Sequence, residues 1–191
     1  MNTRRTALIV TAVALGILAP SGGSGQEQSQ PPKTMKLSLA STAFADGQPI
    51  PQKHTCQGSD VSPPLNWSPQ GGTPADIKSF ALVADDPDAP MGTWVHWVIY
   101  DLPPGTMALP ENVAKTQYAL GNAKQGINDF RRLGYGGPCP PPGKPHRYFF
   151  KLYALDKMLD LKPGATRQDV EAAMKGHVVA EGQLMGTYQR R

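Results

Sequence analysis

Apolar and polar residues alternate along several short stretches of the chain with the two-residue period of a β-strand. In 36–40, for example, Leu37 and Leu39 fall on one face. Residues 79–84 instead form an apolar run, which indicates a central strand that is buried on both faces. The stretches that predict strands are 36–40, 65–67, 79–84, 93–101, 147–155 and 178–188.

One stretch has the signature of a helix. Thr166 can cap its start, with Asp169 three residues further on as in a capping box. Val170 and Met174 then share one face, so a helix is predicted from about 167 to 175. Residues 111–134 show weak periodicity and three glycines, and no element is assigned to them.

Length and composition favour one mainly β domain. The chain has 191 residues with 20 prolines and 20 glycines, and it shows no internal repeat. This length is enough for one substantial core. Many short strands joined by turns rich in proline and glycine are typical of an all-β architecture. The predicted fold is a β-sandwich with one or two peripheral helices.

The first residues are expected to direct export. Two arginines precede an apolar run of 13 residues at 7–19, and small residues follow, so 1–25 predicts a signal peptide. The run is too short to span a bilayer. Residues 26–33 then form a flexible leader and 34–191 a single domain. The mature protein is expected to be periplasmic or secreted, with no integral membrane segment.

Charge and cysteine content narrow the classes of partner. Removing 1–25 reduces the 19 basic side chains to 17 against 15 acidic ones, which leaves a net charge of +2. This balance does not favour nucleic acid or a membrane surface as a partner. Cys56 and Cys139 are the two cysteines, and an oxidising compartment favours a disulfide between them. Two free buried thiols are the alternative, and two cysteines alone cannot form a zinc site.

Two segments combine a rigid loop with a strand that carries a histidine. Residues 86–90 (Asp-Pro-Asp-Ala-Pro) precede 94–97 (Trp-Val-His-Trp), and 136–143 (Gly-Gly-Pro-Cys-Pro-Pro-Pro-Gly) precedes 146–148 (His-Arg-Tyr). If the two strands are neighbours in one sheet, both histidines can line one cavity. Strand alternation predicts two shared faces, one with Trp94, His96, Val98 and Tyr100, the other with His146, Tyr148, Phe150 and Leu152.

These residue types suit an anion. An aspartate near a histidine orients the ring and raises the histidine pKa, and imidazolium with backbone N–H groups suits phosphate or carboxylate. Each residue also has a structural interpretation: Asp86 as a turn residue that bonds its own backbone, and each histidine as a satisfied core residue. A third interpretation is a metal-dependent or acid–base hydrolase that uses Asp86, Asp88, His96 and His146, although no metal-binding spacing is present.

Taken together, the two segments closely resemble the phosphatidylethanolamine-binding protein family, also called Raf kinase inhibitor-like proteins, in its bacterial branch. The stretch 56–67, with Ser-Pro-Pro-Leu at 62–65, fits that branch too, and the resemblance covers about 37–188. It implies a β-sandwich and a pocket for a phosphate-like group. By position in the motifs, the pocket lining is expected to be Asp86, Pro90, Trp94, His96, Gly137, His146 and Tyr148.

The resemblance also implies details of function. A non-catalytic role is expected, with no cofactor or metal, in which the pocket binds phosphate or a phosphoethanolamine-like head group and a partner protein is inhibited or modulated. A cis bond is expected between Ala89 and Pro90. Eukaryotic members carry a C-terminal helix beside the pocket; this chain ends at Arg191, soon after the last predicted strand, and is expected to lack that lid.

Overall fold

The structure is a computed structural model that describes residues 34–72 and 76–190. The predicted signal peptide at 1–25 and the leader at 26–33 lie outside the described residues. Within the described part of the chain, no helix is long and apolar enough to cross a membrane.

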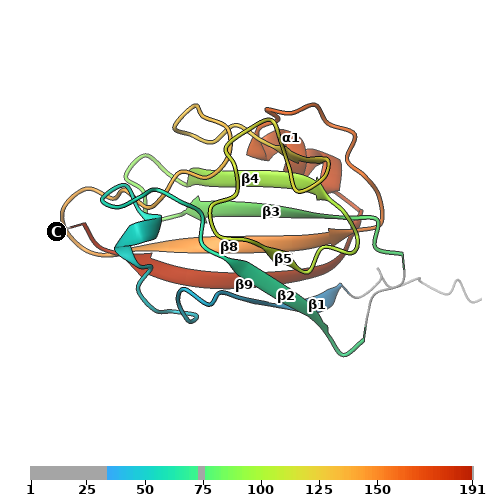
Figure 1. The fold of residues 1–191 in the computed structure, drawn as a ribbon, viewed down its shortest axis with the longest axis horizontal. Helices are drawn as coiled ribbons and strands as arrows, with labels where there is room; N and C mark the ends of the chain where they lie inside the picture. The colour runs from blue at the N-terminus through green and yellow to red at the C-terminus, as the bar shows by residue number, and fades with distance from the viewer. Residues whose placement is uncertain (1–33, 73–75, 191) are drawn as a thin grey trace, which may run out of the picture. The chain divides into compact units, whose positions relative to one another are not determined.

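The described strands form one curled sheet of nine strands in the order β5-β2-β1-β9-β8-β3-β4-β7-β6 (Figure 1). Neighbours are antiparallel except β1 and β9, which are parallel. One α-helix, α1, covers part of one face, so the prediction of a mainly β fold with a peripheral helix is confirmed. The elements are β1 (Met35–Ala40), the short 3₁₀ helix η1 (Gln52–His54), β2 (Leu65–Gln70), β3 (Ser79–Asp86), β4 (Trp94–Leu102), β5 (Ala108–Leu109), β6 (Tyr118–Ala119), β7 (Ala123–Gln125), β8 (His146–Leu155), α1 (Arg167–Met174) and β9 (Val178–Tyr188).

All six predicted strands are present, and the helix begins where its cap was expected. The Thr166 hydroxyl accepts a hydrogen bond from the Asp169 N–H, and the Asp169 carboxylate accepts one from the Thr166 N–H. The short strands β5, β6 and β7 were not predicted, because two or three residues are too few to show a period. Two of them, β6 and β7, lie in 111–134, where the sequence pattern predicts no element.

The core lies on both faces of β3, whose eight residues are all buried. On one face Leu82 packs in a large apolar cluster with side chains such as Phe150. On the other face Val170 and Met174 of α1 join the smaller cluster. Full burial of such side chains stabilises the fold by about 1.5–3 kcal/mol each. The apolar run at 79–84 is thus a central strand, as predicted.

The predicted alternation along β4 is interrupted by a β-bulge at His96. Ala84 of β3 pairs with Trp97, but the next residue, Asp85, pairs with Val95, so His96 has no partner of its own in the register. A bulge places one extra residue in a strand and reverses the alternation of faces beyond it.

The bulge changes which side chains share a face. Trp94 and His96 point into one cavity, but Trp97 joins the large core cluster on that same side. Val98 and Tyr100 turn to the opposite side, in the cluster beneath α1. The prediction that all four of Trp94, His96, Val98 and Tyr100 share a face was therefore wrong beyond His96.

Candidate functional site

A cavity of about 230 Å³ lies at the ends of three interior strands, where β3 ends and β4 and β8 begin. β3 separates β4 from β8, so the two histidine strands are one strand apart and Asp86 stands between them. Five of the seven predicted site residues line this cavity. The full lining is Asp86, Ala89, Pro90, Met91, Trp94, His96, Phe130, Cys139, Pro140, Pro141 and His146.

Asp86 and His146 form a buried pair in the cavity. His146 Nδ1 lies 2.8 Å from Asp86 Oδ2, and the two residues are only 4% and 3% exposed. The second carboxylate oxygen of Asp86 accepts the Asp88 N–H at 2.8 Å. Asp86 therefore acts both as the expected turn residue and as the partner of a histidine. The pair fixes the imidazole, and His146 Nε2 has no hydrogen-bond partner among the described residues.

His96 is held by the second loop. Its Nδ1 donates to the Gly136 carbonyl at 2.6 Å, while the Gly136 N–H donates to the His96 carbonyl at 2.8 Å. Burial lowers the pKa of His96, although the Gly136 carbonyl and the Asp86 charge oppose this shift. The neutral ring therefore carries its proton on Nδ1, which leaves Nε2 as an acceptor.

Aromatic rings surround His96. The centroid of the Phe130 ring lies 5.3 Å from that of His96 and 5.4 Å from that of Trp94, both edge to face. The centroid of the Tyr148 ring lies 5.2 Å from that of His96. Tyr148 is not part of the cavity lining. Burial, and then the negative charge of Asp86, raise the pKa of Tyr148, so the phenol keeps its proton. Tyr148 Oη and Trp94 Nε1 are buried and have no hydrogen-bond partner within the described residues.

Gly137 lies behind the cavity wall rather than in the lining. A Cβ at this position would lie 2.5 Å from the His54 carbonyl oxygen and 2.8 Å from Thr55 Cα, so glycine permits a close backbone approach. Its N–H donates to Asp60 Oδ1 at 2.6 Å. Because this N–H is already bonded to Asp60, the backbone of Gly137 cannot donate it to an anion in the cavity.

The first loop is fixed by an ion pair. The Asp88 carboxylate accepts three hydrogen bonds from Arg147: from its N–H, its Nε and its Nη2, at 2.8–2.9 Å. These bonds hold the pKa of Asp88 at about 2. The expected cis bond between Ala89 and Pro90 was wrong, because no described peptide bond is cis. The loop instead reverses through Gly92, at φ 100°, whose N–H donates to the Ala89 carbonyl.

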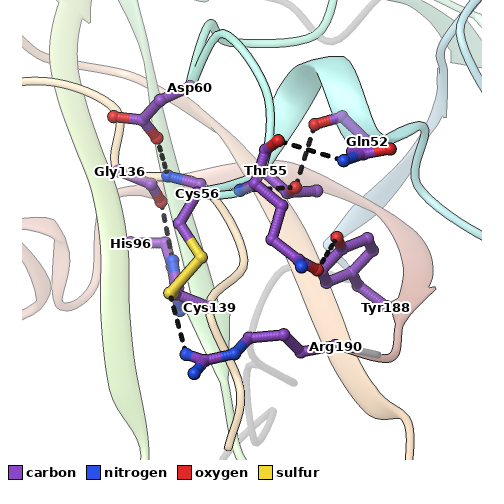
Figure 2. The surroundings of a disulfide bond; sticks show 11 residues. Gln52, Thr55, Cys56, Asp60, His96, Gly136, Cys139, Tyr188 and Arg190 are labelled. Atoms are coloured by element: carbon purple, nitrogen blue, oxygen red, sulfur yellow. Dashed lines mark hydrogen bonds between the residues drawn. A yellow bond between two sulfur atoms is a disulfide. The ribbon is translucent and has the colours of Figure 1, made fainter. Parts of the chain in front are cut away.

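The second loop is fixed by the predicted disulfide. Cys56 and Cys139 are bonded, with Cα atoms 5.4 Å apart, and Cys139 lines the cavity (Figure 2). The Cys56 N–H also donates to the Pro138 carbonyl at 3.1 Å. Figure 2 shows the Arg190 guanidinium beside this disulfide, with Nη1 3.9 Å from Cys139 Sγ.

This fold and site can be compared with known proteins. The sequence profile described as "Phosphatidylethanolamine-binding protein" matches residues 40–189. The chain belongs to the phosphatidylethanolamine-binding protein family.

Members of the family, and proteins named only as UPF0098, are similar over most of the chain. A UPF0098 protein of Methanothermobacter thermautotrophicus is 51% identical over 81% of this chain and 99% of its own length. Among solved structures, a putative phosphatidylethanolamine-binding protein homologue from Chlamydia trachomatis is 39% identical, with TM-score 0.72 over 83% of this chain and 100% of that chain. YbcL of E. coli, described as a new member of the mammalian family, is 32% identical, with TM-score 0.74 over 81% and 99%.

Part of the cavity lining, including Met91 and Phe130, is not predicted from the sequence. Met91 adjoins a predicted residue and is 93% exposed at the cavity. Phe130 lies in the unassigned stretch 111–134, where no periodicity marks it. Its position follows from contacts that only the fold reveals: the Asp129 carboxylate accepts the Val95 N–H at 2.7 Å and thereby docks the loop on β4.

The chemistry of the site is that of two oriented imidazoles, one carboxylate and an apolar surround. Each imidazole has its Nδ1 engaged, by Asp86 or by the Gly136 carbonyl, so its Nε2 is the atom available to a ligand. Among the described residues, no three histidine, cysteine, aspartate or glutamate side chains gather in a way that could hold a metal ion. Such a site can bind a polar group or move a proton.

Proposed function

We propose that this chain is an exported, non-catalytic binding protein whose cavity holds a phosphate group, either free or in a head group such as phosphoethanolamine. The observation that carries the proposal is the locking of both Nδ1 atoms, because it leaves the Nε2 atoms of His96 and His146 for one ligand. Membership of the family supports a ligand-binding role in general. Export rests on the sequence of 1–25 alone.

Protonation links the site to an anion. A bound anion favours the imidazolium form of a nearby histidine, so binding at neutral pH should take up a proton. Because burial lowers the pKa of His96, that ring is neutral before the anion arrives. Affinity for phosphate should therefore fall as the pH rises above the lowered pKa of His96, which means that the fall begins below the usual histidine value of about 6.5. The Trp94 N–H and Tyr148 O–H are further donors near the ring.

Isothermal titration with inorganic phosphate and with phosphoethanolamine tests the proposal. We expect saturable binding that His146→Ala abolishes. His177→Ala is the matched control, because His177 also pairs with an aspartate, Asp156, at 2.8 Å but lies on the surface. Absence of heat with both probes, or equal loss in both variants, would contradict the proposal. Vesicles of phosphatidylcholine with and without phosphatidylethanolamine separate a lipid head group from a free ligand.

A modulatory role for a partner protein is part of the proposal. The apolar rim with its exposed Met91 would be the contact surface. A pull-down from the periplasmic fraction, repeated with Met91→Asp, tests it. We expect the parent chain to capture a specific protein and the Met91→Asp variant not to capture it. Identical capture by the parent and the variant would contradict this role for the rim.

Hydrolysis is a second candidate, favoured by one observation. The hydrogen bond from His146 to Asp86 orients the imidazole as in a general base. Turnover of p-nitrophenyl phosphate, with metal analysis of the purified protein, decides between the candidates. Turnover that Asp86→Asn and His96→Asn both remove would establish an enzyme and overturn the non-catalytic proposal.

A further inference from the structure

The lining of the cavity lacks a fixed positive charge. It contains one carboxylate, Asp86, and two imidazoles, but no lysine or arginine. The His96 ring is neutral at pH 7 because burial lowers its pKa. A site for a multiply charged anion requires a cation to balance the ligand, since burying an unpaired charge is costly. A fixed cation, whose charge does not depend on protonation of an imidazole, has to come from outside the lining.

Two arginines stand directly beside lining residues. Arg190 Nη1 is 3.9 Å from the Sγ of Cys139, and the Arg132 guanidinium carbon is 5.5 Å from the centre of the Phe130 ring (Figure 2 shows Arg190). We propose that Arg132 and Arg190, here called the rim arginines, supply the fixed positive charge of the anion site and select phosphate groups over uncharged ligands. This inference rests on the proposed function and adds to it two binding residues.

Neither rim arginine is engaged by a carboxylate. Within the described part of the chain, no aspartate or glutamate lies within ion-pair distance of Arg132 or Arg190. By contrast, Arg147 is paired with Asp88, and Arg167 is paired with an aspartate and a glutamate. The rim guanidinium groups therefore have donors to offer to a ligand.

Each rim arginine belongs to an anchored segment, and no carboxylate among the described residues pairs with its guanidinium group. The Arg132 N–H donates to Asn128 Oδ1, and its carbonyl accepts the Asn128 N–H. Arg190 closely follows the end of β9, and its neighbour Gln189 donates to the Gly143 carbonyl at 2.6 Å. A guanidinium group keeps its charge at any accessible pH and matches phosphate geometry in bidentate fashion. Its contribution should therefore persist above pH 7, where imidazole loses its charge.

Calorimetry with charge-neutral variants tests the rim arginines. Arg132→Gln and Arg190→Gln should each weaken binding of inorganic phosphate about fivefold to tenfold at pH 7.5, and the double variant should weaken it further. Each loss should shrink as salt is added, because exposed charges are screened. Arg131→Gln and Lys144→Gln are the controls, because they make the same change of charge next to Arg132 and directly after the second loop. Phosphoethanolamine as a second probe and vesicles containing phosphatidylethanolamine distinguish free phosphate from a lipid head group.

The outcomes separate this inference from the proposed function. If rim variants bind like the parent chain while His146→Ala does not bind, the rim arginines are excluded and the anion pocket stands. If the control variants lose as much affinity as the rim variants, the effect is general charge and the inference fails. If the parent chain does not bind either probe, both are wrong. Melting temperatures equal to that of the parent establish that each variant is folded.

Discussion

The two loops that enclose the cavity are held by different kinds of interaction. The first, 86–90, is held by side-chain contacts: Asp86 is hydrogen-bonded to His146, and Asp88 forms an ion pair with Arg147. The second, 136–143, is held by a covalent bond and by close glycine packing. The first loop, here called the first wall, should therefore respond to pH and salt, and the second loop, the second wall, to reduction. The affinity of a ligand that contacts both walls should depend on both conditions.

Hydrogen bonds of Gly136 with His96 and of Gly137 with Asp60 tether the start of the second loop, but the proline-rich part at 138–143 has few tethers. Residues at 138, 140, 141, 142 and 145 are prolines, which have no backbone N–H to donate. In the described structure, the Pro138 carbonyl accepts the Cys56 N–H and the Gly143 carbonyl accepts a bond from Gln189. The disulfide is thus the main link between this proline-rich part and the rest of the domain.

Removing the disulfide should produce the largest effect. Cys56→Ser with Cys139→Ser is expected to lower the free energy of unfolding by about 2–4 kcal/mol, because the bridge closes a long loop. Phosphate affinity should fall as well, since Cys139 is part of the lining. Urea denaturation and calorimetry measure the two quantities. Unchanged affinity in the serine variant would show that the second wall holds its shape without the bond.

A methyl group at Gly137 should have the next largest effect. Gly137→Ala forces a Cβ against the His54 carbonyl oxygen and should cost about 1–3 kcal/mol of unfolding free energy. Gly105→Ala is the control, because no atom of the described residues lies within 4 Å of a Cβ built there. Urea denaturation compares the two variants. Equal stability of both would mean that the second wall yields more easily than its contacts imply.

His96 should make stability depend on pH. Its pKa is lowered in the folded state, so the unfolded chain binds the proton first as the pH falls. Stability is therefore fully present above about 6.5 and is lost as the pH falls toward the lowered pKa. His96→Asn should flatten this slope, and the surface variant His177→Asn should keep it. Thermal melts between pH 4 and 8 measure this slope. An unchanged slope in His96→Asn would contradict the prediction.

Breaking the ion pair of the first wall should have the smallest effect. Arg147→Ala is expected to lower the free energy of unfolding only slightly, because the guanidinium is 54% exposed and screened by solvent. The pair stabilises the fold above about pH 4, and its contribution is lost as the pH falls toward the Asp88 pKa of about 2. Acid unfolding of Arg147→Ala should therefore be flatter in that range. Arg131→Ala is the control, because no carboxylate within the described ranges 34–72 and 76–190 forms an ion pair with Arg131.

The first wall was easier to predict from sequence than the second. Asp86, Pro90, Trp94 and His96 lie within a few residues of one another, so local strand and turn rules place them together at one strand edge. The role of Gly137 could not be predicted in this way. Its environment consists of the backbone of His54 and Thr55, about eighty residues earlier, and no local pattern records that contact.

The longer elements were predictable for a physical reason, and the bulge was not. Six or more residues of alternation, or a capping box with its apolar face, specify an element without tertiary information. In 94–100, however, aromatic and β-branched residues occupy both faces, so the pattern fits a regular strand equally well. Packing decides: Trp97 has no exposed surface, and its Nε1 donates to the Gln125 side chain at 2.7 Å.

The bulge at His96 bears on how β4 tolerates insertions and deletions. In a regular strand, His96 and Trp97 would face opposite sides, and only one of them could lie on the side of the cavity. The extra residue lets adjacent positions serve the pocket and the core on the same side. Deleting a single residue here would leave the hydrogen-bonded ladder intact. The strand could then place a tryptophan in the core or a histidine in the cavity, but not both.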